Sequence, residues 1–354
     1  MSERRAPPEA DGERPRWLRW LTRIALAAGA VGLGVTIYLV GPSEIVAHLR
    51  AIGAWFVVLV AIDLSMSACD TAAVHALTRG PGGPTLGPLL VSQLAGRAVN
   101  AVTPGGTIGD VLKASILSEA ARGPAMVAAV LRLNLTSLCI SLAVIAVGAP
   151  ISAALLDVPG GVRLGLGVAA VLAAATVAVI VALVHRGMLA SLVRVARALH
   201  LVGGARAERW HARLAEIDDA LRGDRARAGR GASVAWVAAS KGLGYVAIWL
   251  IVFSAGYTLG LGELAALLSA GVVLGWLSLL VPMGLGVAEG GNYGLFALIG
   301  APAPLGVSLA LAHRLRQIVV AAIGFSALGI FRLRQRSRRR TPERPAPAPS
   351  STGL

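Results

Sequence analysis

Ten ionisable side chains lie within otherwise apolar stretches of this sequence. They are Asp63, Asp70, Arg97, Asp110, Lys113, Arg132, Lys241, Glu289, Arg314 and Arg316. A lone charge at the centre of a bilayer costs from about 3 to over 10 kcal/mol, so such residues usually face a protein interior or an aqueous cavity. Arginine and lysine placed there bind phosphate, whereas aspartate and glutamate balance a cationic group or bind a proton. These residue types indicate a polar site inside a membrane protein.

The spacing of polar residues predicts which of them share a helix face. Positions i, i+4 and i+7 lie on one face of a helix, and two sets follow this spacing: Asp63, Ser67 and Asp70, and Gln93, Arg97 and Asn100. Asp110 and Lys113 are spaced i, i+3 and can interact along a helix. Each charged pair has a simpler alternative as an ion pair that joins helices, and Glu289 with Arg314 shares this alternative.

A helix-breaking segment, TPGG, separates the second polar set from Asp110. Proline and glycine end a helix and free backbone groups, which at membrane depth must meet a partner or water in a cavity. A new helix beginning at Gly105 or Gly106 would direct N-terminal N–H groups and the positive end of its dipole toward a phosphate or carboxylate. Arg97 and Arg132 would add contacts to a phosphate. The segment therefore predicts an anion site.

The composition assigns these residues to a polytopic membrane protein. Of 354 residues 56% are hydrophobic and 14% charged, with a mean hydropathy of +0.72, whereas soluble domains are about a quarter charged. A membrane span needs about 20 mostly apolar residues. Six windows qualify: 21–40, 52–77, 124–148, 163–185, 232–258 and 305–330. The first is expected to be an uncleaved anchor rather than a signal peptide.

Arginine-rich segments predict the orientation of these spans. The net charge is +15, and arginines gather before the first span, between 186 and 230, and from 332 to 340. Such segments mark the cytoplasmic side, so both termini and the central loop are expected inside the cell (plasma or inner) membrane. Nucleic acid is the weaker explanation of the charge. The apolar regions 86–121 and 264–300 must then each enter and leave on one face, as a re-entrant hairpin or as two short full spans.

The two broken segments are the basis for predicting an inverted repeat. Pro104, Gly106 and Asp110 resemble Pro282, Gly284 and Glu289 about 180 residues later, near half the chain, as a duplication requires. The predicted fold is all-α, with six transmembrane helices and two Gly/Pro-broken re-entrant hairpins. Its expected parts are a disordered tail 1–16, a membrane domain 17–331 with halves 17–185 and 231–331, the loop 186–230, and a disordered tail 332–354. Inverted repeats of this kind are typical of transporters with a site near the bilayer midplane.

Other site chemistries have little support in the sequence. Cys69 and Cys139 stand singly, without the spacing of a metal site or a disulfide framework. The segment GLGVAEGG lacks the strand and the distal acid of a dinucleotide loop. No cofactor, metal ligand or catalytic residue is predicted.

Three segments together resemble a known family. GRAVNAVTPGGTIGDVLKASIL, VPMGLGVAEGG and HRLRQI are similar to the lysylphosphatidylglycerol synthase transmembrane region family. The resemblance implies a flippase-like membrane domain that moves an aminoacylated lipid between leaflets, without the soluble domain that attaches the amino acid, since few residues follow Ile330. Other relatives stand alone or accompany hopanoid and glycan-lipid biosynthesis. By motif position it points to these residues: Arg97, Asn100, Pro104, Gly105, Gly106, Asp110, Glu289 and Arg314.

Three hypotheses follow. The first is a lipid translocase for an anionic or aminoacylated phospholipid or a polyprenyl-type lipid. Its substrate-binding candidates are Arg97, Asn100, Thr103, Pro104, Gly105, Gly106, Asp110, Lys113, Arg132, Glu289 and Arg314, and its candidates for proton or cation coupling are Asp70, Asp110 and Glu289. The second is an intramembrane lipid-phosphate hydrolase with Thr103 or Ser115 as nucleophile. The third is a nonenzymatic membrane partner of a separately encoded lipid or glycan enzyme. The oligomeric state, including a homo-oligomer, is left open.

Overall fold

The computed structural model describes residues 53–79, 83–103, 108–120, 124–186, 216, 219, 224–279 and 286–340. These residues form nine helices: α3 (Trp55–Thr78), α4 (Leu86–Val102), α5 (Ile108–Ala120), α6 (Pro124–Leu155), α7 (Gly160–Arg186), α10 (Asp224–Ser254), α11 (Leu261–Leu279), α12 (Val287–Leu298) and α13 (Ala303–Arg340). The described part confirms an all-helical polytopic membrane protein. The first predicted span, residues 104–106 of the TPGG break and most of the central loop lie outside it.

Six of the described helices are long and apolar enough to cross a membrane: α3, α6, α7, α10, α11 and α13. Five of them overlap predicted windows. The sixth, α11, is the first arm of the second predicted hairpin and has 19 residues. The other three arms, α4, α5 and α12, have 17, 13 and 12 residues, or about 26, 20 and 18 Å at 1.5 Å per residue, which is less than a hydrocarbon core of about 30 Å.

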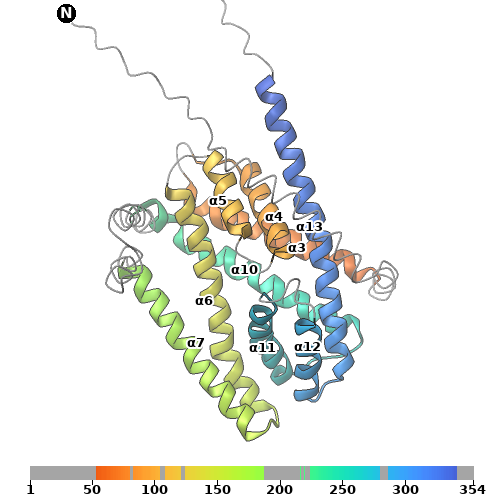
Figure 1. The fold of residues 1–354 in the computed structure, drawn as a ribbon. Helices are drawn as coiled ribbons and strands as arrows, with labels where there is room; N and C mark the ends of the chain where they lie inside the picture. Colours follow the sequence, from red (N-terminus) through yellow and green to blue (C-terminus); the bar gives the residue numbers. More distant parts are fainter. Residues whose placement is uncertain are drawn as a thin grey trace, which may run out of the picture.

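The last helix extends beyond the C-terminal end of the predicted span 305–330. α13 has 38 residues and therefore extends for about 57 Å, more than the roughly 40–45 Å of a whole bilayer. Its arginine-rich end reaches Arg340, so residues 332–340, which the sequence assigned to a disordered tail, are helical. Figure 1 shows this end standing clear of the other helices.

The two hairpins occupy opposite ends of the helix bundle. α4 and α5 lie side by side in its upper part in Figure 1, and α11 and α12 lie side by side in its lower part. Both hairpins stand between α6 on one side and α13 on the other. Two hairpins entering from opposite ends are what an inverted repeat requires.

The packing partners of the helices also follow the pattern of a repeat. α3 packs against α10, the helix at the equivalent place in the second half. α4 packs against α13, and its counterpart α11 packs against α6. The second arm of each hairpin contacts the long helix that follows it, α5 with α6 and α12 with α13. Exchanging the two halves therefore leaves the list of helix contacts nearly unchanged, as a two-fold relation between them would.

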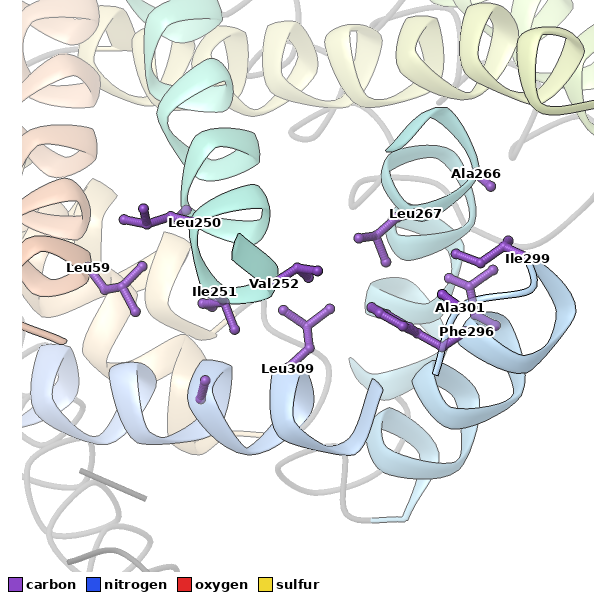
Figure 2. Close-up of a cluster of buried hydrophobic side chains, with 13 residues drawn as sticks. Leu59, Leu250, Ile251, Val252, Ala266, Leu267, Phe296, Ile299, Ala301 and Leu309 are labelled. Atoms are coloured by element: carbon purple, nitrogen blue, oxygen red, sulfur yellow. The ribbon is translucent and has the colours of Figure 1, made fainter. Parts of the chain in front are cut away.

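A cluster of buried apolar side chains anchors the second hairpin to the long helices. Figure 2 shows Phe296 of α12, Leu309 of α13 and Leu267 of α11 gathered between these helices. Ile251 of α10 belongs to the same cluster. Phe296 is fully buried. Dispersion contacts of this kind favour helix association in lipid, where the hydrophobic effect between helices is absent. The cluster holds the second hairpin in place beside α10 and α13.

Glycines allow several of these helices to approach closely, and one of them gives a test of the packing. A Cβ at Gly324 of α13 would collide with the backbone oxygen of Leu94 and the side chain of Ala98 on α4, whereas a Cβ at Gly329 meets nothing within 4 Å. We expect Gly324→Val to lower the free energy of unfolding by about 1–3 kcal/mol, because backbone cannot move aside as a flexible side chain does. Gly329→Ala, the control, should leave it nearly unchanged. Thermal unfolding in detergent measures both, and equal stability of the two variants would contradict this packing of α13 on α4.

Candidate functional site

A cavity of about 200 Å³ lies where the two hairpins meet. From the first hairpin it is lined by Asn100, in the last turn of α4, and by Thr103, the residue that ends this helix. From the second hairpin it is lined by Ser278, at the end of α11, and Ala288, at the start of α12. Described residues next to the break in each hairpin therefore border the same space.

The cavity wall is apolar on one part and hydrogen-bonding on the other. Leu267 and Leu309 belong both to the wall and to the apolar cluster in Figure 2. The polar lining is as follows: Asn100, Thr103, Ser278, Asn292, His313, Arg314 and Gln317. A largely apolar wall with a few placed polar groups is typical of small-molecule sites. It also suits an amphiphile, whose head and tail need different surroundings.

One cation and one carboxylate dominate the electrostatics of the cavity. Arg314 lines it and is itself buried, with 7% of the residue exposed. Its Nη2 lies 2.5 Å from Oε1 of Glu289. The other carboxylate oxygen of Glu289 accepts a hydrogen bond of 2.9 Å from the backbone N–H of Gly286, which precedes α12. Glu289 thus caps α12, and its ion pair with Arg314 connects α12 to α13. The two charges of this pair cancel.

Asn100 and Thr103 are held by the backbone around the first break. Oδ1 of Asn100 accepts a hydrogen bond of 2.7 Å from the N–H of Gly109, in the first turn of α5. The Thr103 hydroxyl donates to the carbonyl of Val99 at 2.8 Å. One of the backbone N–H groups at the start of this helix, which were predicted to bind an anion, is therefore bonded to Asn100. Pro104, Gly105 and Gly106 lie outside the described residues, so the predicted anion contacts from them stay predictions.

The sequence of the chain matches the family described as "Lysylphosphatidylglycerol synthase TM region" over residues 20–324. The chain belongs to this family. The match confirms the resemblance carried by the three motifs, and it supports a lipid-related role in a membrane. No curated protein and no solved structure matches the chain.

In this member of the lysylphosphatidylglycerol synthase TM region family, two other predicted site residues form an ion pair with each other and do not line the cavity. Nη2 of Arg97 lies 2.5 Å from Oδ2 of Asp70, which joins α4 to α3. Lys241 of α10 is within electrostatic range of both. Arg132 is buried, with 9% of the residue exposed, and does not line the cavity. The phosphate clamp predicted from Arg97 and Arg132 is thus not assembled at this cavity.

Asp110 is the centre of a second polar cluster, in the first hairpin. Its Oδ1 lies 2.9 Å from Nζ of Lys113, as the i, i+3 spacing predicted. Its Oδ2 accepts a hydrogen bond of 2.9 Å from the side-chain amide of Asn134 on α6. Sequence reasoning missed Asn134, although its spacing from Asp110 is nearly that of Arg314 from Glu289. In both halves an acid in the first turn of the short helix thus bonds to the long helix that follows.

Of the ion pairs in the described part of the chain, the most buried lies between the two halves. Arg316 of α13 makes two hydrogen bonds to Asp63 of α3, at 2.8 and 2.7 Å. Their side chains are 5% and 9% exposed. Both residues were among the predicted buried charges, but no spacing rule pairs residues on helices so distant in sequence. This bidentate pair satisfies both charges and links the halves.

Proposed function

We propose that this protein is a lipid translocase and that the cavity between the hairpin tips receives the lipid headgroup. The observation that carries this proposal is that residues beside both helix breaks, one in each half, line one cavity together with Arg314. In inverted-repeat transporters the site lies between such broken helices near the bilayer midplane. We take both hairpins as re-entrant and both termini as cytoplasmic.

The charges around the cavity favour a headgroup with one phosphate. Arg314 is the cation in the wall, and charge-assisted hydrogen bonds to a phosphate are about twice as strong as neutral ones. If the phosphate takes the place of Glu289 on Arg314, then Glu289 becomes free to bind an ammonium group or a proton. An aminoacylated or otherwise amine-bearing phospholipid satisfies both partners. An anionic phospholipid or polyprenyl-type lipid would instead need Glu289 to be protonated.

The amide and hydroxyl groups of the wall would form hydrogen bonds with the parts of the lipid headgroup other than the phosphate. Asn292 of α12, Gln317 of α13 and Asn100 of α4 all belong to the lining. Each side-chain amide has two N–H donors and an oxygen that accepts two hydrogen bonds, so beyond the bonds of Asn292 to Ala288 and of Gln317 to His313 these amides keep capacity for the hydroxyl or amine groups of a head. The apolar wall around Leu267 and Leu274 is suited to the glycerol region and the first part of the acyl chains.

A lipid-phosphate hydrolase is the second candidate function, because the cavity contains Thr103 and His313. However, the Thr103 hydroxyl donates to a carbonyl of its own helix, whereas an activated nucleophile donates to a general base. His313 is 3.2 Å from the amide of Gln317. This geometry favours binding over covalent chemistry. The third candidate, a membrane partner of a separately encoded enzyme, has no specific contact in its favour.

Reconstituted protein distinguishes these functions. We expect proteoliposomes to transfer fluorescently labelled phosphatidylglycerol, or its lysyl ester, between leaflets faster than protein-free vesicles, as measured by dithionite quenching of the exposed label. Release of inorganic phosphate from a polyprenyl pyrophosphate by the same preparation should stay at the protein-free rate. Transfer no faster than in empty vesicles for every head tested, or phosphate release above background, would refute the translocase.

A further inference from the structure

Two buried donor groups near the start of α10 lack a partner in the described part of the chain. Ser233 is 2% exposed, and its hydroxyl makes no hydrogen bond there. Three residues earlier, Nε of Arg230 is also buried without a partner. At least about 90% of buried polar groups in proteins are hydrogen-bonded. Two unpaired donors within one helical turn therefore indicate a place where a ligand with acceptor oxygens binds.

The other buried serines of the described helices behave differently from Ser233. Ser141 is a hydrogen-bond partner of Tyr245. The rest donate to a backbone carbonyl and are as follows: Ser67, Ser92, Ser115, Ser152, Ser240 and Ser269. A serine within a helix commonly bonds to the carbonyl of the preceding turn. Ser233 does not bond to the carbonyl of Gly229, so its hydroxyl stays available to another acceptor.

The helix face that carries these donors is packed against two other helices. Arg230, Ser233, Val237 and Ser240 are spaced by three, four and three residues and so share one face of α10. Val237 belongs to a buried apolar cluster with residues of α3 and α6. The Ser240 hydroxyl donates to the carbonyl of Met66 on α3. The two unpaired donors therefore lie where α10 meets α3 and α6.

A second cation lies close to these donors. Arg132 of α6 is 9% exposed and is near enough to Arg230 for the two charges to repel. None of the ion pairs in the described part of the chain includes Arg230. Repulsion between like charges is stronger in a protein interior than in water. An anion bound beside Arg230 would offset this repulsion and connect α10 to α6.

The place is separate from the cavity and accessible from one side of the membrane. Arg132, Arg230 and Ser233 are not among the residues that line the cavity. Arg230 is the second residue of the apolar span that begins at Gly229, and it is half-buried rather than fully buried. The arginine-rich segment before this span assigns its start to the cytoplasmic side. A ligand would therefore reach Arg230 from the cytoplasm.

We propose that Arg230 and Ser233, with the nearby charge of Arg132, form a binding site for a phosphate group at the cytoplasmic end of α10. Nε of Arg230 and the hydroxyl of Ser233 donate hydrogen bonds to phosphate oxygens. Arginine suits this ligand because its planar guanidinium matches phosphate geometry and its charge strengthens each bond. The phosphate is that of a soluble cytoplasmic compound or of an inner-leaflet lipid, since both present the same oxygens. The site does not depend on the translocase function.

Equilibrium binding of radiolabelled inorganic phosphate tests this site. Full-length protein that carries Arg314→Ala, which removes the cation of the cavity wall, is purified in a neutral detergent. We expect saturable binding that Arg230→Gln weakens at least about tenfold, which corresponds to about 1.4 kcal/mol. Ser233→Ala should weaken it about threefold, because a neutral hydrogen bond contributes less than a charged one. Its melting temperature without phosphate should not fall, since the Ser233 hydroxyl has no partner to lose.

Two control variants and two competitors complete the experiment. Ser240→Ala, on the same face but bonded to Met66, and Arg334→Gln, an exposed arginine of α13, should bind phosphate like the parent protein. Displacement at lower concentration by glycerol 1-phosphate identifies a soluble ligand, and displacement at lower concentration by dioctanoyl phosphatidylglycerol identifies a lipid; both support the site. No saturable phosphate binding, unchanged affinity in Arg230→Gln, or an equal loss in Arg334→Gln would overturn the proposal.

Discussion

Replacing Arg314 by alanine is expected to reduce lipid transfer by roughly ten- to a hundredfold. Hydrogen bonds to charged groups contribute about 1.5–3 kcal/mol, and each 1.4 kcal/mol is tenfold in rate or affinity. Arg314 lines the cavity and is the partner of Glu289, so its loss removes the phosphate-binding cation and leaves the half-buried carboxylate of Glu289 without its ion pair. The dithionite assay in proteoliposomes measures the rate.

The control for this prediction lies on the same helix. Arg334 is exposed on the extended part of α13, far from the cavity wall in sequence, and Arg334→Ala should transfer lipid at the wild-type rate. Arg314→Lys tests geometry, because lysine keeps the charge but lacks the planar fork that binds phosphate bidentately. It should recover part of the rate. Wild-type transfer by a folded Arg314→Ala protein would remove Arg314 from the mechanism.

Breaking the pair between the halves is expected to have the largest effect on stability. Asp63→Ala leaves the guanidinium of Arg316 buried without its two hydrogen bonds, and removing one partner of a buried ion pair costs about 3–5 kcal/mol. Both side chains are nearly inaccessible, so little solvent screening reduces this cost. Thermal unfolding in detergent should show a large drop in melting temperature.

A double variant separates the charge effect from the packing effect. Asp63→Leu with Arg316→Met removes both charges and keeps most of the volume, and replacing a buried pair by apolar residues is often neutral. Its melting temperature should therefore recover most of the loss. A single Asp63→Ala variant as stable as the wild type would show that the pair is more open to water than its burial indicates.

The helical architecture could be predicted from the sequence because lipid imposes strong rules on it. Apolar length fixed five of the six described spans, and the prolines and glycines marked both hairpins. The departures have local causes. α11 is long enough to count as a span because its apolar run begins at Leu261, and α13 continues to Arg340 because arginine and leucine are good helix formers.

Pairing of the charges was harder to predict, for a geometric reason. Lys113 with Asp110 follows from spacing along one helix, and that pair was predicted. Arg97 with Asp70 and Arg316 with Asp63 join different helices, and periodicity gives the face of a residue but not the helix that the face meets. The predicted clamp of Arg97 and Arg132 was inferred without knowing which helices their faces meet, and neither residue lines the cavity. Arg314, which borders the cavity, was predicted through its place in the motif.

Paired cysteines test most directly whether the tips of the opposed hairpins meet around one cavity. Thr103→Cys and Ser278→Cys are combined in a protein that carries Cys69→Ala and Cys139→Ala, and native membranes containing it are treated with a flexible bis-maleimide. Met66→Cys with Gly244→Cys is the positive control, because these two positions are in contact between α3 and α10. We expect cross-linking of both pairs, and less cross-linking of the first pair when lysyl-phosphatidylglycerol is added. Cross-linking of the control pair alone would contradict the shared cavity.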